Sequence, residues 1–176
     1  MRINNSASKI AVVLIDMQEF FLKRIEKAIV KEMVRNQSTV INFCASHKIP
    51  VIVLEYEGVG RGKTISPLQQ ELKKTPTIVI RKPHNSGFRD TDLDDVLKKL
   101  KVKKLVLMGI NANGCVQDTA IGALFRRYDI ATARGVIANQ YSKRNENLVM
   151  TKKWFSANGK FFESPADLIG YIQKTV

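Results

Sequence analysis

The sequence predicts an α/β fold in which a mostly parallel, doubly wound sheet carries helices on both faces. Short continuous apolar runs, typical of strands buried on both sides, alternate with segments whose apolar residues recur at helical spacing. Strands that alternate with helices in this way produce a parallel sheet. We expect the strand order 3-2-1-4-5-6. No repeat, low-complexity tract or linker interrupts the pattern, so residues 1–176 are expected to form a single domain.

The expected elements follow one another along the whole chain. Strands are predicted at residues 9–15, 51–56, 77–80, 105–108, 129–133 and 159–162. Helices are predicted over 25–44, after 64–67, from 91 to 100, from 115 to 124, over 148–155 and over 166–173. Thr91 is expected to cap its helix, with Asp94 placed as in a capping box. Ser164 and Pro165 are expected to begin the last helix.

The composition is that of an ordinary globular protein. Of 176 residues, 44% are hydrophobic and 26% charged, which is enough for a core and unlike a disordered chain. No apolar run approaches the roughly 20 residues that cross a bilayer, and the first residues lack the apolar core of a signal peptide. Two cysteines far apart in sequence indicate free thiols in a reducing compartment. We therefore expect a cytoplasmic protein without a membrane partner.

The net charge of +13, with a pI near 9.9, has two interpretations. Such a surface attracts nucleic acid or other anions through its long-range field. The lysines are nevertheless scattered, with pairs at 73–74, 98–99, 103–104 and 152–153, and form no basic helix or platform with interleaved aromatic residues. We favour a generally basic, solvated surface and keep nucleic-acid binding as the alternative.

The strongest functional signal lies in residues 104–127. An apolar strand leads through Gly109 and Gly114 into a helix that begins at Cys115. The helix dipole and free N–H groups there are expected to favour the thiolate and to hold a developing oxyanion. Cys115 is therefore a candidate nucleophile. The alternative is a buried, inert cysteine, which is how we interpret Cys44, while His47 is interpreted as a helix C-terminal residue.

Two further reactive side chains follow strands of the predicted sheet. Asp16 comes directly after the first strand and Lys82 after the third, whereas Cys115 follows the fourth. Ligands of doubly wound sheets bind beyond the carboxyl ends of the strands, where the strand order reverses. With strands one and four adjacent, these three side chains are expected to converge. A Cys–His pair using His84 is a weaker alternative, because nothing comparable orients that loop residue.

These residues lie in motifs that the chain shares with a known family. VVLIDMQEFF at 12–21, the stretch 81–93, and GINANGCVQDTA at 109–120 resemble the isochorismatase-like cysteine hydrolases, which include nicotinamidases and N-carbamoyl amidases. The resemblance implies a three-layer α/β/α fold, self-association and a catalytic triad at Asp16, Lys82 and Cys115. It also implies a cis peptide at Ile110-Asn111, with the N–H groups of Asn111 and Cys115 forming the oxyanion hole.

The chain departs from the nicotinamidases of this family. They carry an Asp and His cluster after the second strand, whereas residues 54–58 here contain no His, so we predict no metal and no cofactor. Residues 112–114 also differ, which leaves the substrate class open. Because Cys115 is present, we expect thioester-based hydrolysis of an amide-type C–N bond in a small amide or ureide. The alternative in another class is a non-catalytic or regulatory binding protein on the same fold.

Four residues near strand ends are candidates for the substrate pocket. Phe20, Tyr56 and Phe88 could form an apolar wall, with plain packing as the alternative for each. Gln18 either points into the site or holds the neighbouring loop. The glycines between Gly58 and Gly62 match no phosphate-binding fingerprint and are expected to form a flexible loop over the pocket.

Overall fold

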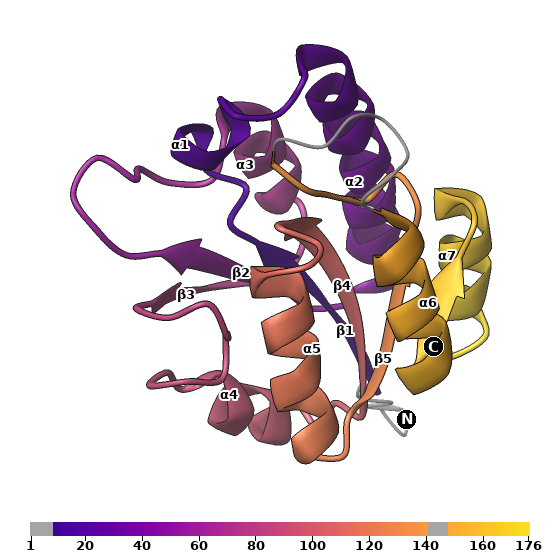
Figure 1. The fold of residues 1–176 in the computed structure, drawn as a ribbon. Helices are drawn as coiled ribbons and strands as arrows, with labels where there is room; N and C mark the ends of the chain where they lie inside the picture. Colours follow the sequence, from indigo (N-terminus) through magenta and orange to yellow (C-terminus); the bar gives the residue numbers. More distant parts are fainter. Residues whose placement is uncertain (1–8, 141–147) are drawn as a thin grey trace.

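The computed structural model describes residues 9–140 and 148–176, and its centre is a seven-stranded sheet (Figure 1). The main path of the sheet runs β3-β2-β1-β4-β5-β7, and β6 pairs with β4 off this path. Every pairing is parallel. The strands are β1 (Ile10–Ile15), β2 (Val51–Tyr56), β3 (Thr77–Lys82), β4 (Lys104–Ile110), β5 (Asp129–Ala133), β6 (Ile137–Ala138) and β7 (Lys160–Phe162).

Helices cover the sheet on both faces, which gives the three layers that were expected. Helices α2, α3 and α7 lie together behind the sheet in Figure 1, and α4, α5 and α6 lie in front of it. The helices are α1 (Glu19–Leu22), α2 (Lys27–His47), α3 (Ser66–Leu72), α4 (Leu93–Lys99), α5 (Cys115–Phe125), α6 (Leu148–Asn158) and α7 (Pro165–Gln173). The α/β class and the strand order predicted from the sequence are confirmed, and the predicted sixth strand is β7.

The central strands are apolar because both of their faces are covered. All six residues of β1 are buried, and β1 pairs with β2 on one side and β4 on the other. Chain connections leave β1 and β4 in opposite directions, so the topological switch point lies between these two strands. Burial on both faces explains why each reads as a continuous apolar run rather than an alternating one.

Gly109 allows the carboxyl ends of β1 and β4 to approach each other. It pairs with Ile15, and its φ of 123° is one that side chains rarely adopt. A Cβ at this position would lie 2.0 Å from the carbonyl oxygen of Ile15. A glycine is therefore required where the two strands deliver their following residues to one edge of the sheet.

Three local features differ from the sequence-based expectations. The short helix α1 and the two-residue strand β6 were not predicted. Helix α4 begins at Leu93 with Asp92 in the N-cap position, and the Thr91 hydroxyl accepts from the N–H of Leu93 at 3.3 Å, so Thr91 satisfies a donor of this helix terminus as expected. The other half of the expected capping box is not formed, because the Asp94 carboxylate accepts a hydrogen bond from the Tyr128 hydroxyl at 2.8 Å and pairs with Lys98. The cap at Ser164 is confirmed, since its side chain accepts from the N–H of Asp167.

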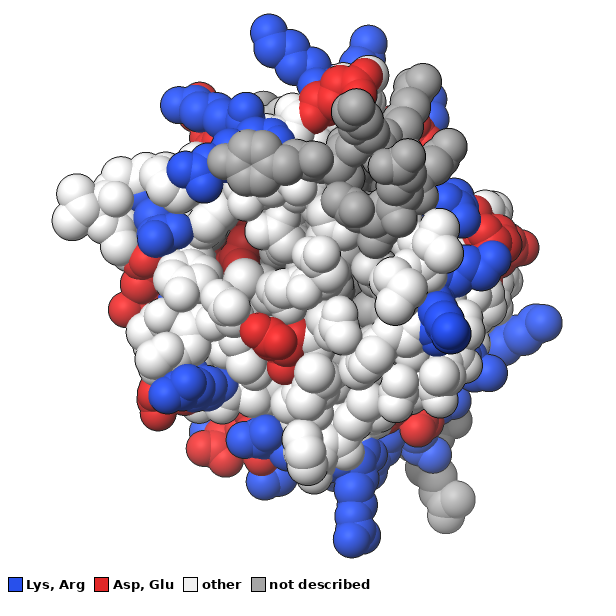
Figure 2. Space-filling model, in the orientation of Figure 1, with Lys and Arg blue, Asp and Glu red and all other residues white. Residues whose placement is uncertain are grey.

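The charged side chains are distributed widely over the molecule. In Figure 2, Lys and Arg lie around the rim of the visible face, interspersed with Asp and Glu, and the centre of that face is largely uncharged. This distribution agrees with the scattered lysines of the sequence. Within residues 9–140 and 148–176, no helix combines the length and the apolar character that crossing a membrane requires.

Candidate active site

A buried ion pair lies at the carboxyl edge of the sheet. The ammonium of Lys82, at the end of β3, contacts Oδ2 of Asp16 at 2.9 Å, and both side chains are almost completely buried. Lys82 also donates hydrogen bonds to the carbonyl oxygens of His84 and Asn85, at 3.1 and 3.2 Å. All three ammonium protons therefore have acceptors, which fixes the position of the charge.

Asp16 presents one engaged and one free carboxylate oxygen. It follows β1 with a left-handed φ of 54°, a conformation that Asp tolerates better than most residues. Its buried Oδ1 accepts no hydrogen bond from any described residue. Burial raises the pKa of this carboxyl above its usual value, and the neighbouring Lys82 opposes that rise. Asp16 thus offers a free, unusually basic acceptor at the switch point.

Cys115 begins α5 and faces the same edge. Its Sγ lies 3.7 Å from the side-chain oxygen of Asn85, and it is close enough to Asp16 and Lys82 for both charges to act on it. Burial, followed by the negative charge of Asp16, raises the pKa of the thiol to about 12, and Lys82 only partly offsets this. This direction is opposite to the lowered thiol pKa expected at the helix N-terminus, and its largest cause is burial.

The turn before Cys115 contains a cis peptide between Ile110 and Asn111. The carbonyl oxygen of Asn111 accepts from the N–H groups of Gly114 and Val116, both at 3.0 Å, which closes the turn tightly. By contrast, the N–H groups of Asn111 and Cys115 donate to no acceptor in the part of the chain that the structure describes. These are the two donors that the predicted oxyanion hole requires.

Residues following β6 hold this turn in place. The N–H of Ala112 donates to the carbonyl of Ala138 at 2.9 Å. The side chains of Asn111 and Gln140 share a hydrogen bond, and the Gln140 N–H donates to Oδ1 of Asn111 at 2.8 Å. Gln140 also donates to the carbonyl of Phe21, which links the turn to α1. The turn that precedes Cys115 is therefore held in place by hydrogen bonds from a separate segment of the chain.

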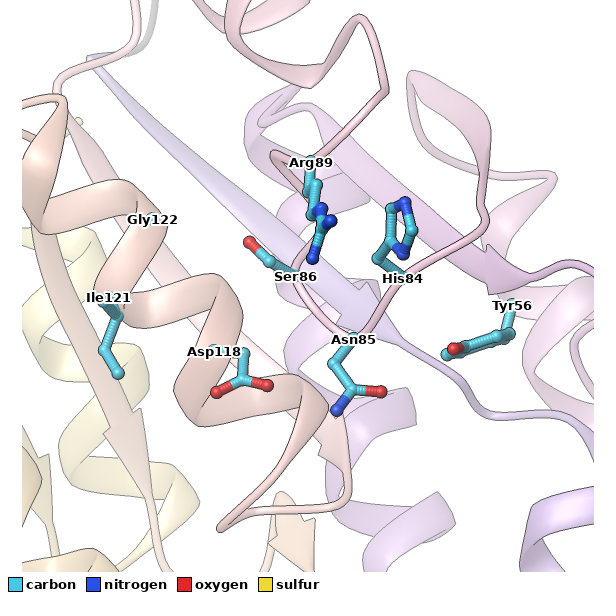
Figure 3. Close-up of a pocket in the computed structure, with 8 residues that line it drawn as sticks. All are labelled: Tyr56, His84, Asn85, Ser86, Arg89, Asp118, Ile121 and Gly122. Carbon is cyan, nitrogen blue, oxygen red and sulfur yellow. The ribbon is translucent and has the colours of Figure 1, made fainter.

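A pocket of about 490 Å³ opens beside these residues (Figure 3). Tyr56 and Asn85 connect it to the buried pair, since the Lys82 ammonium lies 4.3 Å from the centroid of the Tyr56 ring. Figure 3 shows Asp118 on the first part of α5, beside the Asn85 side chain. The pocket is lined by Tyr56, His84, Asn85, Ser86, Arg89, Asp118, Ile121 and Gly122.

The histidines and the second cysteine are engaged elsewhere. Nε2 of His84 contacts Oδ2 of Asp90 at 2.8 Å, so its ring is paired with a surface carboxylate. The geometry thus favours Asp16 over His84 as the partner of Cys115. Cys44 is fully buried in α2, and burial raises the pKa of its thiol to about 12. His47 ends α2 with Nδ1 2.9 Å from the Phe43 carbonyl.

The four predicted pocket residues have different surroundings. Tyr56 lines the pocket. The buried Gln18 amide bonds to the backbone of Tyr56 at both its nitrogen and its oxygen, and to the Gly62 carbonyl, which corresponds to the alternative of holding the loop. Phe20 is half-buried beneath arginine side chains. Phe88 packs against Tyr128 with 6% of its surface exposed, which corresponds to the packing alternative.

The position of the nicotinamidase metal cluster is occupied differently in this chain. Glu55, near the end of β2, is buried, and its Oε1 accepts from both the N–H and the hydroxyl of Thr64, at 2.7 and 3.0 Å. No histidine follows β2 before β3. The residues of this segment therefore do not fit a bound metal, because its buried carboxylate, Glu55, is committed to fixing a loop.

Three residues near the triad were not singled out from the sequence. Asn85 follows Lys82 by three positions and contacts Cys115, but its own loop composition gave no chemical signal. Asp118 lies one helical turn after Cys115, a spacing that would have placed it on the same face. Arg61 belongs to the glycine-rich loop, and only tertiary contacts bring its charge near Asp16.

Comparisons with known proteins identify the family to which the chain is similar. A family model described as the isochorismatase domain matches residues 10–149. Nicotinamidase 3 of Arabidopsis thaliana is 25% identical over 164 residues, which cover 81% of this chain and 80% of the relative.

Solved structures share the same fold. N-carbamoylsarcosine amidase from Thermoplasma acidophilum matches with a TM-score of 0.73 and 24% identity, over 89% of this chain and 96% of that one. The MAR1 ribonuclease from Caenorhabditis elegans matches with a TM-score of 0.80 and 23% identity, over 100% and 92%. At these identities the likenesses establish the fold alone.

Proposed function

The chain belongs to the isochorismatase family, and from this premise we propose that it is a cysteine hydrolase that cleaves an amide-type C–N bond of a small molecule. The observation that carries the proposal is the meeting of Asp16, Lys82 and Cys115 at the switch point, with one Asp16 oxygen left free. The relative named nicotinamidase supports an amide as the substrate class.

In the proposed first step, Cys115 attacks the substrate carbonyl as its proton passes to Asp16. Because burial keeps the thiol protonated at rest, proton transfer accompanies attack rather than preceding it. The N–H groups of Asn111 and Cys115 stabilise the oxyanion that forms. Asp16 then returns the proton to the nitrogen of the leaving group, the C–N bond breaks, and a thioester remains on Cys115.

In the second step, a water molecule attacks the thioester carbonyl. Asp16 takes a proton from the water, the C–S bond breaks, and the proton returns to the sulfur as the acid product leaves. The ammonium of Lys82 stabilises the carboxylate form of Asp16 between transfers. No metal takes part in any step.

The test is hydrolysis of a panel of small amides, ureides and N-carbamoyl compounds, followed as released amine or ammonia. We expect turnover by the wild type and by Cys44→Ala, and its loss in Cys115→Ala and Asp16→Asn. Acid quenching during turnover should trap an acyl adduct on the peptide containing Cys115. Equal activity in wild type and Cys115→Ala would refute the proposal.

A second candidate function is nucleic-acid binding, favoured by the net charge of +13. It predicts affinity for labelled RNA or DNA that falls steeply between low and moderate salt, with a log–log slope that counts phosphate contacts. An amidohydrolase has no reason to show such a slope. Fluorescence anisotropy measured between about 25 and about 200 mM salt, an eightfold range, separates the two candidates.

Several expectations stay predictions. We propose that residues 1–176 act as one domain and that the protein self-associates, as the family resemblance implies. Light scattering on the purified protein tests the oligomeric state. Two free thiols, Cys44 and Cys115, are consistent with the predicted cytoplasmic location.

A further inference from the structure

The geometry points to Arg61 as a specificity-determining residue that binds a carboxylate of the substrate, so that the substrate is an amide or ureide carrying an acid group. The inference rests on the proposed function and names its substrate class. Arg61 lies in the loop 58–62, between β2 and α3. Two observations support it: the fixed position of the guanidinium, and the absence of an anionic partner for it among the described residues.

Aromatic rings hold the guanidinium of Arg61 at the site. Its Cζ lies 4.8 Å from the ring centroids of both Phe20 and Tyr56, and 5.2 Å from that of Phe21. The Lys82 ammonium lies 4.3 Å from the same Tyr56 centroid. The guanidinium of Arg61 and the ammonium of Lys82 therefore both lie close to the Tyr56 ring. Stacking of this kind orders a guanidinium while leaving its edge N–H groups available.

The loop that carries Arg61 is anchored at the same place. Gln18 donates hydrogen bonds to the carbonyls of Arg61 and Gly62, at 3.3 and 2.8 Å, and Glu55 fixes Thr64. The backbone of Arg61 is therefore tied to the residue that follows Asp16 by two positions. The side chain is positioned from both ends, by its backbone and by the rings.

The Arg61 guanidinium has no anionic partner in the protein. Among the described residues it makes no ion pair and donates no side-chain hydrogen bond, although the residue is only partly exposed. Lys82, in contrast, is neutralised by Asp16. The positive charge of Arg61 is therefore not neutralised by any described residue, and it acts on Asp16.

A half-buried guanidinium with free donors is suited to a carboxylate, which it binds through two parallel hydrogen bonds. A phosphate-binding loop is a poorer interpretation, because the next helix, α3, is short and begins only at Ser66, so its N-terminus does not lie at Arg61 in the sequence. A purely structural role in ring stacking is the remaining alternative. The two roles differ in one respect: only carboxylate binding makes the reactivity of Cys115 depend on the charge of the incoming molecule.

The test uses two alkylating reagents, iodoacetylglycine and iodoacetylglycinamide, which differ only in a terminal carboxylate against a neutral carboxamide. Rates at Cys115 are measured by peptide mapping for wild type, Arg61→Gln, Arg61→Lys and the matched control Lys63→Gln. The same Cys115 thiolate attacks the iodine-bearing carbon of both reagents and displaces iodide, so any change in thiol pKa cancels in the ratio of their rates. Unchanged reaction with the neutral reagent shows that the site is still folded.

We expect Arg61→Gln to lower the acid-to-amide rate ratio by about tenfold, the contribution of a charge-assisted contact. Arg61→Lys should retain part of it, and Lys63→Gln should leave it within twofold of wild type. A ratio that Arg61→Gln leaves unchanged, or that Lys63→Gln lowers equally, overturns the inference alone. Equal hydrolysis of the amide panel by wild type and Cys115→Ala overturns the proposed function, and the inference with it.

Discussion

The buried pair of Asp16 and Lys82 allows a quantitative prediction about stability. At 2.9 Å, the attraction between the two charges is about 6 kcal/mol if the effective dielectric constant is about 20. The desolvation of both groups offsets much of this, so the pair as a whole adds little net stability. Removal of one partner is different, because it leaves the other charge buried alone, at a cost of about 3–5 kcal/mol.

The perturbation is a double-mutant cycle with Lys82→Met and Asp16→Asn, which remove charge and keep most of the shape. We expect each single variant to lose about 3–4 kcal/mol of unfolding free energy. The double variant should lose only about 1 kcal/mol, much less than either single one, because neither charge is then left unpaired. This corresponds to a coupling energy of about 6 kcal/mol. Urea denaturation followed by circular dichroism measures all four proteins.

The pH dependence gives a second reading of the same pair. Burial raises the pKa of Asp16 in the folded protein, so the folded state holds the proton more tightly than the unfolded chain does. Stability therefore falls as the pH rises from about 3.8 through the raised value. Lys82→Met removes the charge that opposes the rise in the Asp16 pKa, so the fall in stability continues to higher pH. The loss of unfolding free energy in Lys82→Met should therefore be larger at pH 8 than at pH 5. Additive costs within about 0.5 kcal/mol, with no pH dependence, would refute the reasoning.

Three other perturbations are predicted to have distinct effects. Gly109→Ala should cost about 3 kcal/mol or prevent folding, as measured by urea denaturation, because its Cβ would lie 2.0 Å from the Ile15 carbonyl oxygen. Gln18→Ala should accelerate limited tryptic cleavage after Arg61 about tenfold, because it removes the hydrogen bonds from the Gln18 amide to the carbonyls of Arg61 and Gly62. Unchanged cleavage would contradict the role of Gln18 in fixing this loop. Alkylation of Cys115 should keep increasing above pH 10, because its pKa is about 12, whereas a plateau near pH 8 would indicate an activated thiolate.

The sequence predicted the fold well where local pattern and burial agree. The strands β1, β2 and β4 are apolar throughout because they lie inside a doubly covered sheet, and such runs are recognisable without tertiary information. The strand β6 has two residues and was missed, because its pairing with β4 depends on a contact between distant segments. The Asp94 half of the capping box at α4 was predicted wrongly for a similar reason, since the Asp94 carboxylate accepts a hydrogen bond from the distant Tyr128 instead.

The candidate site was predicted to the extent that topology determines it. Residues that follow β1, β3 and β4 must gather at one edge of the sheet, which is enough to bring Asp16, Lys82 and Cys115 together. Burial was not accessible from the pattern, so the direction of the thiol pKa was predicted wrongly. The stacking of Arg61 on rings from two other segments was equally inaccessible, because loop composition carries no information about such contacts.

A protonated resting thiol is consistent with the rest of the site. A permanent thiolate beside Asp16 would place two negative charges in a buried space with only Lys82 to balance them. With the thiol neutral, Lys82 compensates Asp16 alone, and the positive charge of Arg61 is left for the substrate. A substrate carboxylate would neutralise Arg61 in the way that Asp16 neutralises Lys82. Burial and the charge of Asp16 thus explain why Cys115 holds its proton at rest, and the unpaired guanidinium of Arg61 is the reason that we propose an acid as the substrate.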